Sequence, residues 1–293
     1  MNAGSMCISC ILSKEELAIR QFPDEDKKSE YMHQVLGILY KYAQTESSPG
    51  LTERLEQLFE DFWGTAKDFR EQKHKYNQLL LNMESQIEQQ IEGSADSLET
   101  CIKYVCAANY IDFSAVDDVN EQKLGELLSK AVSQDISKEE YLKFQKDLQA
   151  ARKLVYLTDN CGEIVLDKIF VRQIQEKFPK LQITVIVRGG NVINDATMED
   201  AEEIGLTQIV PCIGNGNAAP GTIIERLSEQ AKDILYNADL IISKGQGNFE
   251  SLYGENLNPY YLFLCKCELF VQRFHMKQYQ SMFVKEERLE ITR

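Results

Sequence analysis

Residues 153–163, which read KLVYLTDNCGE, join a short apolar run to an abrupt polar end. The run at 154–158 has the length and the β-branched and aromatic content of a buried strand. Asp159 and Asn160 follow it directly, and the apolar spacing of a helix covers 163–178. A strand, a polar turn and an amphipathic helix form the first half of a βαβ unit.

The same alternation continues to the end of the chain. The other candidate strands are short apolar runs at 183–188, 208–212, 240–243 and 261–265. The other candidate helices are amphipathic and cover 195–204 and 221–236. The pattern predicts an α/β fold with a mostly parallel sheet flanked by helices, a Rossmann-like core. Ligands of such sheets bind beyond the carboxyl ends of the strands, so we expect the functional site there.

The chain before residue 150 has a different character, because its apolar residues recur at helical spacing. Predicted helices lie at 31–42, 51–62, 72–91 and 98–108, and a further helix follows the capping box of Ser137 and Glu140. We therefore expect an all-helical N-terminal region at 1–150 and an α/β catalytic core at 151–293.

The composition narrows the class of protein. The 293 residues include 46 acidic and 32 basic side chains, which give a formal net charge of −14, and 43% are hydrophobic. A core can be buried, and the negative charge argues against nucleic-acid and anionic membrane partners. No apolar run reaches about eighteen residues and no signal peptide is visible, so we expect a cytoplasmic protein with its eight cysteines reduced.

Two amide–acid pairs follow neighbouring candidate strands. Asp159 and Asn160 form the first pair, and Asn194 and Asp195 form the second. Carboxylate and amide oxygens are suitable ligands for Mg²⁺ or Mn²⁺, so the two pairs could hold one divalent cation between them. The alternative is that each pair caps the helix that follows it.

Cationic side chains also stand at strand ends. Arg188 ends the second candidate strand and could pair with an anion. Lys244 follows the fourth strand beside Gly245 and can reach a phosphate as a point charge, although a solvated turn lysine is the ordinary alternative. The glycine-rich loop at 214–221 matches the dinucleotide fingerprint weakly, and a substrate loop or a plain turn fits it better.

Other catalytic patterns are missing from the sequence. There is no G-x-S-x-G elbow and no phosphate-binding G-x-x-x-x-G-K-[ST] loop. The three histidines have no metal-ligand spacing, which argues against a histidine-based zinc enzyme. Cys7 and Cys10 form a single C-x-x-C, for which a structural metal site, a redox pair and inert thiols all stay open.

These motifs together resemble the damage-control phosphatase family, formerly the domain of unknown function eighty-nine. The resemblance rests on DNCGE at 159–163, RGG at 188–190, NDAT at 194–197 and KGQGNFE at 244–250. Similar family segments match ANYIDF at 108–113, DFR at 68–70 with Lys73 and Asn77, and KC at 266–267. The resemblance covers nearly the whole chain, and the C-x-x-C of Cys7 and Cys10 resembles the microbial branch.

The resemblance implies a metal-dependent phosphatase that acts on small phosphorylated metabolites, including sugar phosphates and damaged cofactor precursors. Asp159, Asn160 and Asp195 would be the ligands of Mn²⁺, Co²⁺, Ni²⁺ or Mg²⁺, and Lys244 would bind the phosphate. The substrate would be surrounded by Glu163, Arg188, Asn109, Asp112, Asn194 and Gly245. Asp159 could instead be a nucleophile that forms an aspartyl-phosphate, and we favour the ligand role.

The chain departs from the family pattern at two places. Phe69 stands where the family often has proline, and GNAA at 216–219 replaces a segment that commonly carries an acid before PGT at 220–222. The identity of the substrate is therefore not predicted more closely. Two other functions stay open, a methyltransferase that uses S-adenosylmethionine, with the glycine loops around the nucleoside, and a non-enzymatic metal- or metabolite-binding protein.

Overall fold

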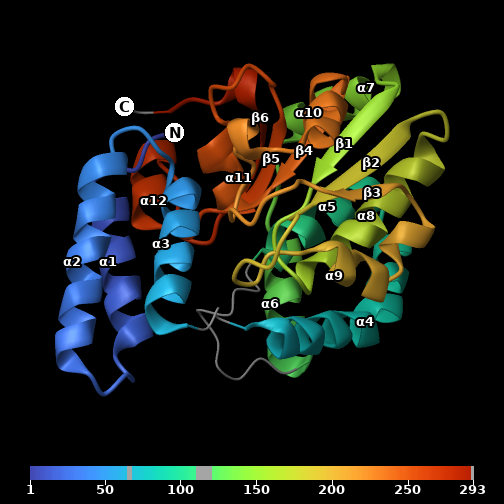
Figure 1. Ribbon diagram of the computed structural model, residues 1–293. Helices are drawn as coiled ribbons and strands as arrows, with labels where there is room; N and C mark the ends of the chain where they lie inside the picture. Colours follow the sequence, from blue (N-terminus) through green and yellow to red (C-terminus); the bar gives the residue numbers. More distant parts are fainter. Residues whose placement is uncertain (65–67, 110–120, 292–293) are drawn as a thin grey trace.

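The computed structural model describes residues 1–64, 68–109 and 121–291 of the chain. Figure 1 shows a central twisted sheet covered by helices on both faces, with a group of three helices to one side. The strands are β1 (Lys153–Leu157), β2 (Gln182–Val187), β3 (Cys212–Gly214), β4 (Leu240–Lys244), β5 (Tyr260–Leu264) and β6 (Ser281–Lys285). The expected α/β fold with a mostly parallel sheet is confirmed.

The order of the strands places the site. The sheet runs β3-β2-β1-β4-β5-β6, and only β6 is antiparallel to its neighbour. From β1 the chain first builds outward through β2 and β3, and then returns to add β4 on the other side of β1. The chain therefore turns in opposite directions after β1 and β4. The carboxyl ends of these two strands, which we call the crevice, are the switch point where ligands of such sheets bind.

The strands are continuous apolar runs because both faces of the sheet are covered. Leu154 and Tyr156 of β1 belong to one buried cluster, and Val155 and Leu157 belong to the cluster on the opposite face. The first cluster is formed with α4 (Arg70–Glu92), α5 (Ser97–Ala108), α6 (Glu121–Val132), α7 (Lys138–Ala150), α8 (Glu163–Lys177) and α9 (Met198–Glu203). The second is formed with α10 (Glu229–Tyr236), α11 (Gly245–Leu252) and α12 (Glu268–Phe274).

The first three helices have an apolar core of their own. They are α1 (Ser5–Ile19), α2 (Glu25–Tyr42) and α3 (Ser48–Trp63), and their buried side chains form a third cluster. The remaining helices of the N-terminal half share a buried cluster with the sheet. The division at residue 150 into two regions stays a prediction. No helix in the described parts of the chain combines the length and the apolar character needed to cross a bilayer.

Several predicted boundaries are wrong after the second strand. The run at 208–212 is not the third strand, because a 3-10 turn at Leu206–Gln208 ends there and pairing with β2 begins only at Cys212. The helix expected over 195–204 begins at Met198, where Thr197 and Asp200 form the capping box. The helix expected over 221–236 begins at Glu229, after Ser228 caps it. The helices α1, α6, α11 and α12 and the strand β6 were not predicted.

Candidate functional site

The two amide–acid pairs meet at the crevice between the ends of β1 and β4. A single β-bridge joins Asn160 to Asp195, and the amide of Ala196 donates to the carbonyl of Asp159 at 2.8 Å. The amide of Cys161 donates to the carbonyl of Asn194, also at 2.8 Å. These backbone bonds hold the two loops together, and the pairs are brought within one buried site as the strand order requires. The roles of these residues as ligands stay predictions.

The Asp159 carboxylate lies at the centre of the site. Its Oδ2 accepts hydrogen bonds at 2.8 Å from the side-chain amides of Asn109 and Asn160. Burial raises the pKa of Asp159 to about 8, and the neighbouring Glu163 and Asp195 carboxylates act in the same direction. Burial likewise raises the pKa of Asp195. This crowding of buried acids is the electrostatic setting that a bound cation would relieve.

Two amides are oriented by the same neighbours. Asn109 and Asn160 also donate to Oε2 of Glu163, at 3.0 and 3.1 Å. Asn109 accepts a bond of 3.2 Å from the amide of Leu264 at the end of β5. The nitrogen of the Asn160 amide is thus directed to the acids, which leaves its Oδ1 as the atom that could bind a cation.

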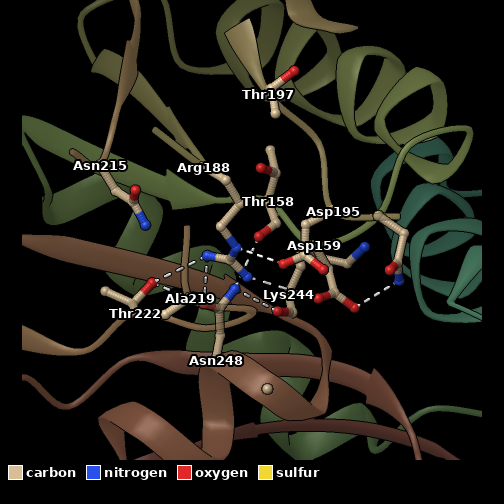
Figure 2. Close-up of polar contacts among 12 residues, drawn as sticks. Thr158, Asp159, Arg188, Asp195, Thr197, Asn215, Ala219, Thr222, Lys244 and Asn248 are labelled. Atoms are coloured by element: carbon tan, nitrogen blue, oxygen red, sulfur yellow. Dashed lines mark hydrogen bonds and ion pairs between the residues drawn. The ribbon is translucent and has the colours of Figure 1, made fainter. Parts of the chain in front are cut away.

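Arg188 lies in the crevice, and two of its three guanidinium nitrogens make hydrogen bonds there. Its Nε donates to Oδ2 of Asp195 at 2.5 Å, and its Nη1 donates to Oδ1 of Asn248 at 3.0 Å and to Thr222 Oγ1 at 3.5 Å. Its Nη2 is buried without a hydrogen-bond partner in the described structure and lies 3.9 Å from Oδ1 of Asp159. Figure 2 shows the guanidinium group between Asp195 and Asn248. A buried unpaired donor of this kind can receive an anionic oxygen.

Lys244 has two carboxylate partners. Its Nζ lies 2.8 Å from Oε1 of Glu163 and 2.9 Å from Oδ1 of Asp167, and no part of the side chain is exposed. Burial alone would lower the pKa of Lys244, but the two acids outweigh it and raise the pKa above its usual range. Its predicted role in binding phosphate stays a prediction, and the contacts it makes here are internal ones.

Asp167 was not predicted to lie at the site from the sequence. It lies four residues after Glu163 on α8, accepts a hydrogen bond of 2.6 Å from Tyr156 and is fully buried. Burial raises its pKa to about 6 even though Lys244 opposes the shift. The signal that could have identified it is an acid on the apolar face of a helix, one turn after another acid.

Residues of α4 support the turn after β1. The Asn77 side chain accepts from the amide of Gly162 at 2.6 Å and donates to Asp200 at 2.9 Å. Lys73 is buried and pairs with Asp200 at 2.7 Å. Both residues thus connect α4 to the loops that carry the two amide–acid pairs, although they touch neither pair in the described contacts.

The remaining predicted site residues are placed as follows. Gly245 begins α11 beside the Asp159 carboxylate. The side chain of Asn194 is buried, and its Nδ2 has no hydrogen-bond partner in the described structure. Asp112 lies outside the described residues. Lys266 follows β5 and lowers the pKa of Asp159 through its charge, against the stronger effect of burial.

The donor set at the crevice fits a hard divalent cation. Asp159 and Asp195 offer carboxylate oxygens and Asn160 offers an amide oxygen, the ligand types of Mg²⁺ and Mn²⁺. Within the described residues no group of three or more histidine, cysteine, aspartate or glutamate side chains is arranged to hold a metal ion. The candidate set differs from such a group because one of its three members is an amide. Its fit therefore rests on the mixed donor chemistry and on the crowding of buried acids.

Comparison with known proteins gives the family. The model of the damage-control phosphatase ARMT1-like domain matches residues 4–282. The chain belongs to this family. A damage-control phosphatase of Archaeoglobus fulgidus is 29% identical over 273 residues, which are 92% of this chain and 93% of the relative. A damage-control phosphatase of Pyrococcus horikoshii is 27% identical over 267 residues, which are 89% and 90% of the two chains.

A solved structure has the same fold. The crystal structure of a DUF89 family protein from Pyrococcus horikoshii matches with a TM-score of 0.86 and 23% identity, and the match covers 98% of this chain and 99% of the other. The resemblance of the sequence motifs to the damage-control phosphatase family is confirmed at the level of the family by the match of the family model. The assignment of Cys7 and Cys10 to a microbial branch stays a prediction.

Proposed function

We propose that the protein is a metal-dependent phosphatase that hydrolyses phosphate monoesters of small metabolites, such as sugar phosphates or damaged phosphorylated metabolites. The phosphatase role is supported by the family and by two relatives named damage-control phosphatases. One observation carries the proposal. The side-chain oxygens of Asp159, Asn160 and Asp195 lie in the same crevice as Nη2 of Arg188, which has no hydrogen-bond partner in the described structure. Acidic and cationic groups side by side suit a phosphate that arrives together with a cation.

In this proposal Asp159, Asn160 and Asp195 hold a divalent cation, which is Mn²⁺, Co²⁺, Ni²⁺ or Mg²⁺. When bound, that ion supplies positive charge to the phosphoryl oxygens. Arg188 donates Nη2 to a phosphoryl oxygen, while Asp195 holds its Nε at 2.5 Å. Burial of both side chains keeps water away from these charges and strengthens their interaction with the phosphate.

A panel of phosphorylated metabolites, with and without Mn²⁺, tests the function. We expect phosphate release only with the metal, and chelation should abolish it. Binding of Mn²⁺ without release from any substrate would favour a non-enzymatic binding protein. Thermal stabilisation by S-adenosylmethionine without a divalent ion, together with no phosphate release, would favour the methyltransferase.

The variant Asp159→Asn tests the site itself. We expect activity to fall by more than about 100-fold, since loss of even an outer partner of a metal ligand typically costs 10–100-fold. The melting temperature should not fall, because burial already raises the pKa of Asp159 to about 8 and a neutral side chain of the same shape removes that cost. Asp147→Asn on α7, which removes a partly buried pair with Lys285 of β6, is the control that should stay active. Full activity of Asp159→Asn would refute the site.

A further inference from the structure

We propose that Asn248 is the positioning residue of Arg188, holding the guanidinium group so that Nη2 meets the phosphate; this rests on the proposed function. Asn248 lies on α11 and is fully buried. Its Oδ1 accepts from Nη1 of Arg188 at 3.0 Å and from Oγ1 of Thr222 at 2.8 Å. It therefore acts on the substrate only through another residue.

The carboxamide of Asn248 has a fixed orientation. Its Nδ2 donates to the carbonyl of Thr158 at 2.9 Å and to that of Lys244 at 2.7 Å. Thr158 directly follows β1 and Lys244 ends β4, so one amide ties together the two strand ends that form the crevice (Figure 2). Because Nδ2 has two carbonyl acceptors, the amide cannot turn over, and Oδ1 must face Arg188.

The contacts of Arg188 show why this matters. Nε is held by the Asp195 carboxylate and Nη1 by Asn248, so two edges of the planar group are fixed and the third edge carries Nη2. Without Oδ1 of Asn248, Nη1 keeps only Thr222, at 3.5 Å. The guanidinium group could then rotate about the Nε contact, and Nη2 would no longer be directed to the crevice.

The local structure brings the partners into reach. A Cβ added at Gly247 would lie 2.2 Å from the carbonyl oxygen of Pro220. The backbone of α11 therefore packs directly against the backbone of the loop before Thr222. Ser251 completes the contact, since its Oγ accepts from the amide of Thr222 at 2.8 Å. Ser251 holds the same loop without touching Arg188 in the described contacts, which makes it a matched control.

A double-mutant cycle tests the proposal with inorganic phosphate as the probe. Phosphate affinity of the full-length protein with Mn²⁺ is measured by calorimetry for wild type, Asn248→Ala, Arg188→Lys and the double variant. We expect Asn248→Ala to weaken phosphate binding about tenfold in the wild-type background and less than twofold in the Arg188→Lys background, which keeps the charge but lacks Nη1. Ser251→Ala should change the affinity by less than twofold in both.

The outcomes separate this proposal from the proposed function. Equal losses in both backgrounds, or no loss in either, would show that Asn248 acts without Arg188 and would overturn the inference, as would failure of wild type to bind phosphate. Phosphate binding with the expected coupling but no hydrolysis of any substrate would refute the phosphatase and leave the inference standing. If Asn248→Ala does not fold, Thr222→Val replaces it in the cycle. That variant removes the hydroxyl shared by Asn248 and Arg188, and the loss should be smaller but again confined to the Arg188 background.

Discussion

Gly245 is the position where one added carbon atom would disturb the site most directly. A Cβ there would lie 2.0 Å from Oδ2 of Asp159, and the residue has a φ of +79°. The Gly245→Ala variant must therefore displace the carboxylate as well as strain the backbone. We expect most of the phosphatase activity to be lost, with a destabilisation of about 1–3 kcal/mol from the strain.

Gly205→Ala is the control for this variant. Gly205 has a φ of +75° but nothing within 4 Å of its Cβ position, so it carries similar backbone strain without a contact to the site. Urea unfolding and phosphate release should be measured on both variants. Similar destabilisation with activity lost only in Gly245→Ala is the expected result. Activity retained in both would show that the Asp159 carboxylate need not occupy its observed position.

The proximity of some candidate site residues could be predicted from the sequence. Asp159, Asn160 and Asp195 could be brought together in advance because the carboxyl ends of adjacent parallel strands share one edge of the sheet. The proximity of Asn248 and Asp167 to the site could not be predicted, because each reaches the site only through one turn of its helix. Asn248 lies four residues after Lys244 on a helix that was not predicted, and Asp167 lies four residues after Glu163. Asp112 falls outside the described residues.

The ion pairs between the end of β4 and α8 decide what Lys244 does. The lysine is the buried counter-charge of two acids on α8, so Lys244→Met would leave both unpaired in the interior. We expect it to lower the free energy of unfolding by about 3–5 kcal/mol. Phosphate affinity, measured in the folded fraction, should fall less than it does in Arg188→Lys.

Lys168→Met on the same helix is the matched control. Lys168 is also a buried lysine, but it lies away from the crevice and pairs with Glu84 at 2.7 Å. When Lys168 is replaced, Arg172 still balances the charge of Glu84. Chemical unfolding and phosphate calorimetry on the two variants distinguish the possible roles. A loss of phosphate affinity in Lys244→Met greater than in Arg188→Lys would assign the phosphate to Lys244, as the family resemblance implied.

The contact of α11 with α3 predicts a pH dependence of stability. Burial raises the pKa of Glu250 from 4.5 to about 7, against the hydrogen bond it receives from Ser48. Since the folded chain then binds more protons than the unfolded chain between these values, the stabilising contribution is complete below about pH 4.5 and is lost as the pH rises through 7. The effect is at most roughly 3 kcal/mol.

Glu250→Gln should remove that part of the pH dependence. With metal removed by a chelator, the melting temperature of wild type should be higher at pH 5 than at pH 8, and the variant should show a smaller difference. Glu229→Gln, at a side chain that is 89% exposed, should behave as wild type does. An unchanged pH dependence in Glu250→Gln would show that Glu250 is not the responsible group.

The whole molecule is a sheet whose site is bordered by helices from both halves of the sequence. The architecture followed from the alternation after residue 150, because buried parallel strands are recognisable as short apolar runs. The antiparallel strand β6 was missed because half-buried runs such as Ser281–Lys285 lack that signal. The placement of α1, α2 and α3 could not be predicted, because it involves contacts between segments far apart in the sequence.

Arg226 provides such a connection. It follows the loop that carries Thr222, and it pairs with Glu46 at 2.9 Å, with Glu53, and with the carbonyl of Gly50 at 3.4 Å. These partners lie just before and within α3, so one side chain connects the three-helix group to the loop at the crevice. We expect Arg226→Met to cost about 1.5–3 kcal/mol, the range for hydrogen bonds to charged groups.

Hydrogen exchange localises the effect of this variant. Amides of α3 should exchange faster in Arg226→Met, while those of β1 and β4 keep their protection, because the contact holds the helical group to the sheet and does not hold the sheet together. The KM for substrate should also rise in Arg226→Met, since the loop that carries Thr222 loses its ion pairs with the three-helix group. Arg20→Met removes an exposed pair between the residue that caps α1 and Glu16 of that helix, and it should change neither quantity. Unaltered exchange in α3 of Arg226→Met would show that apolar packing alone places the helices beside the site.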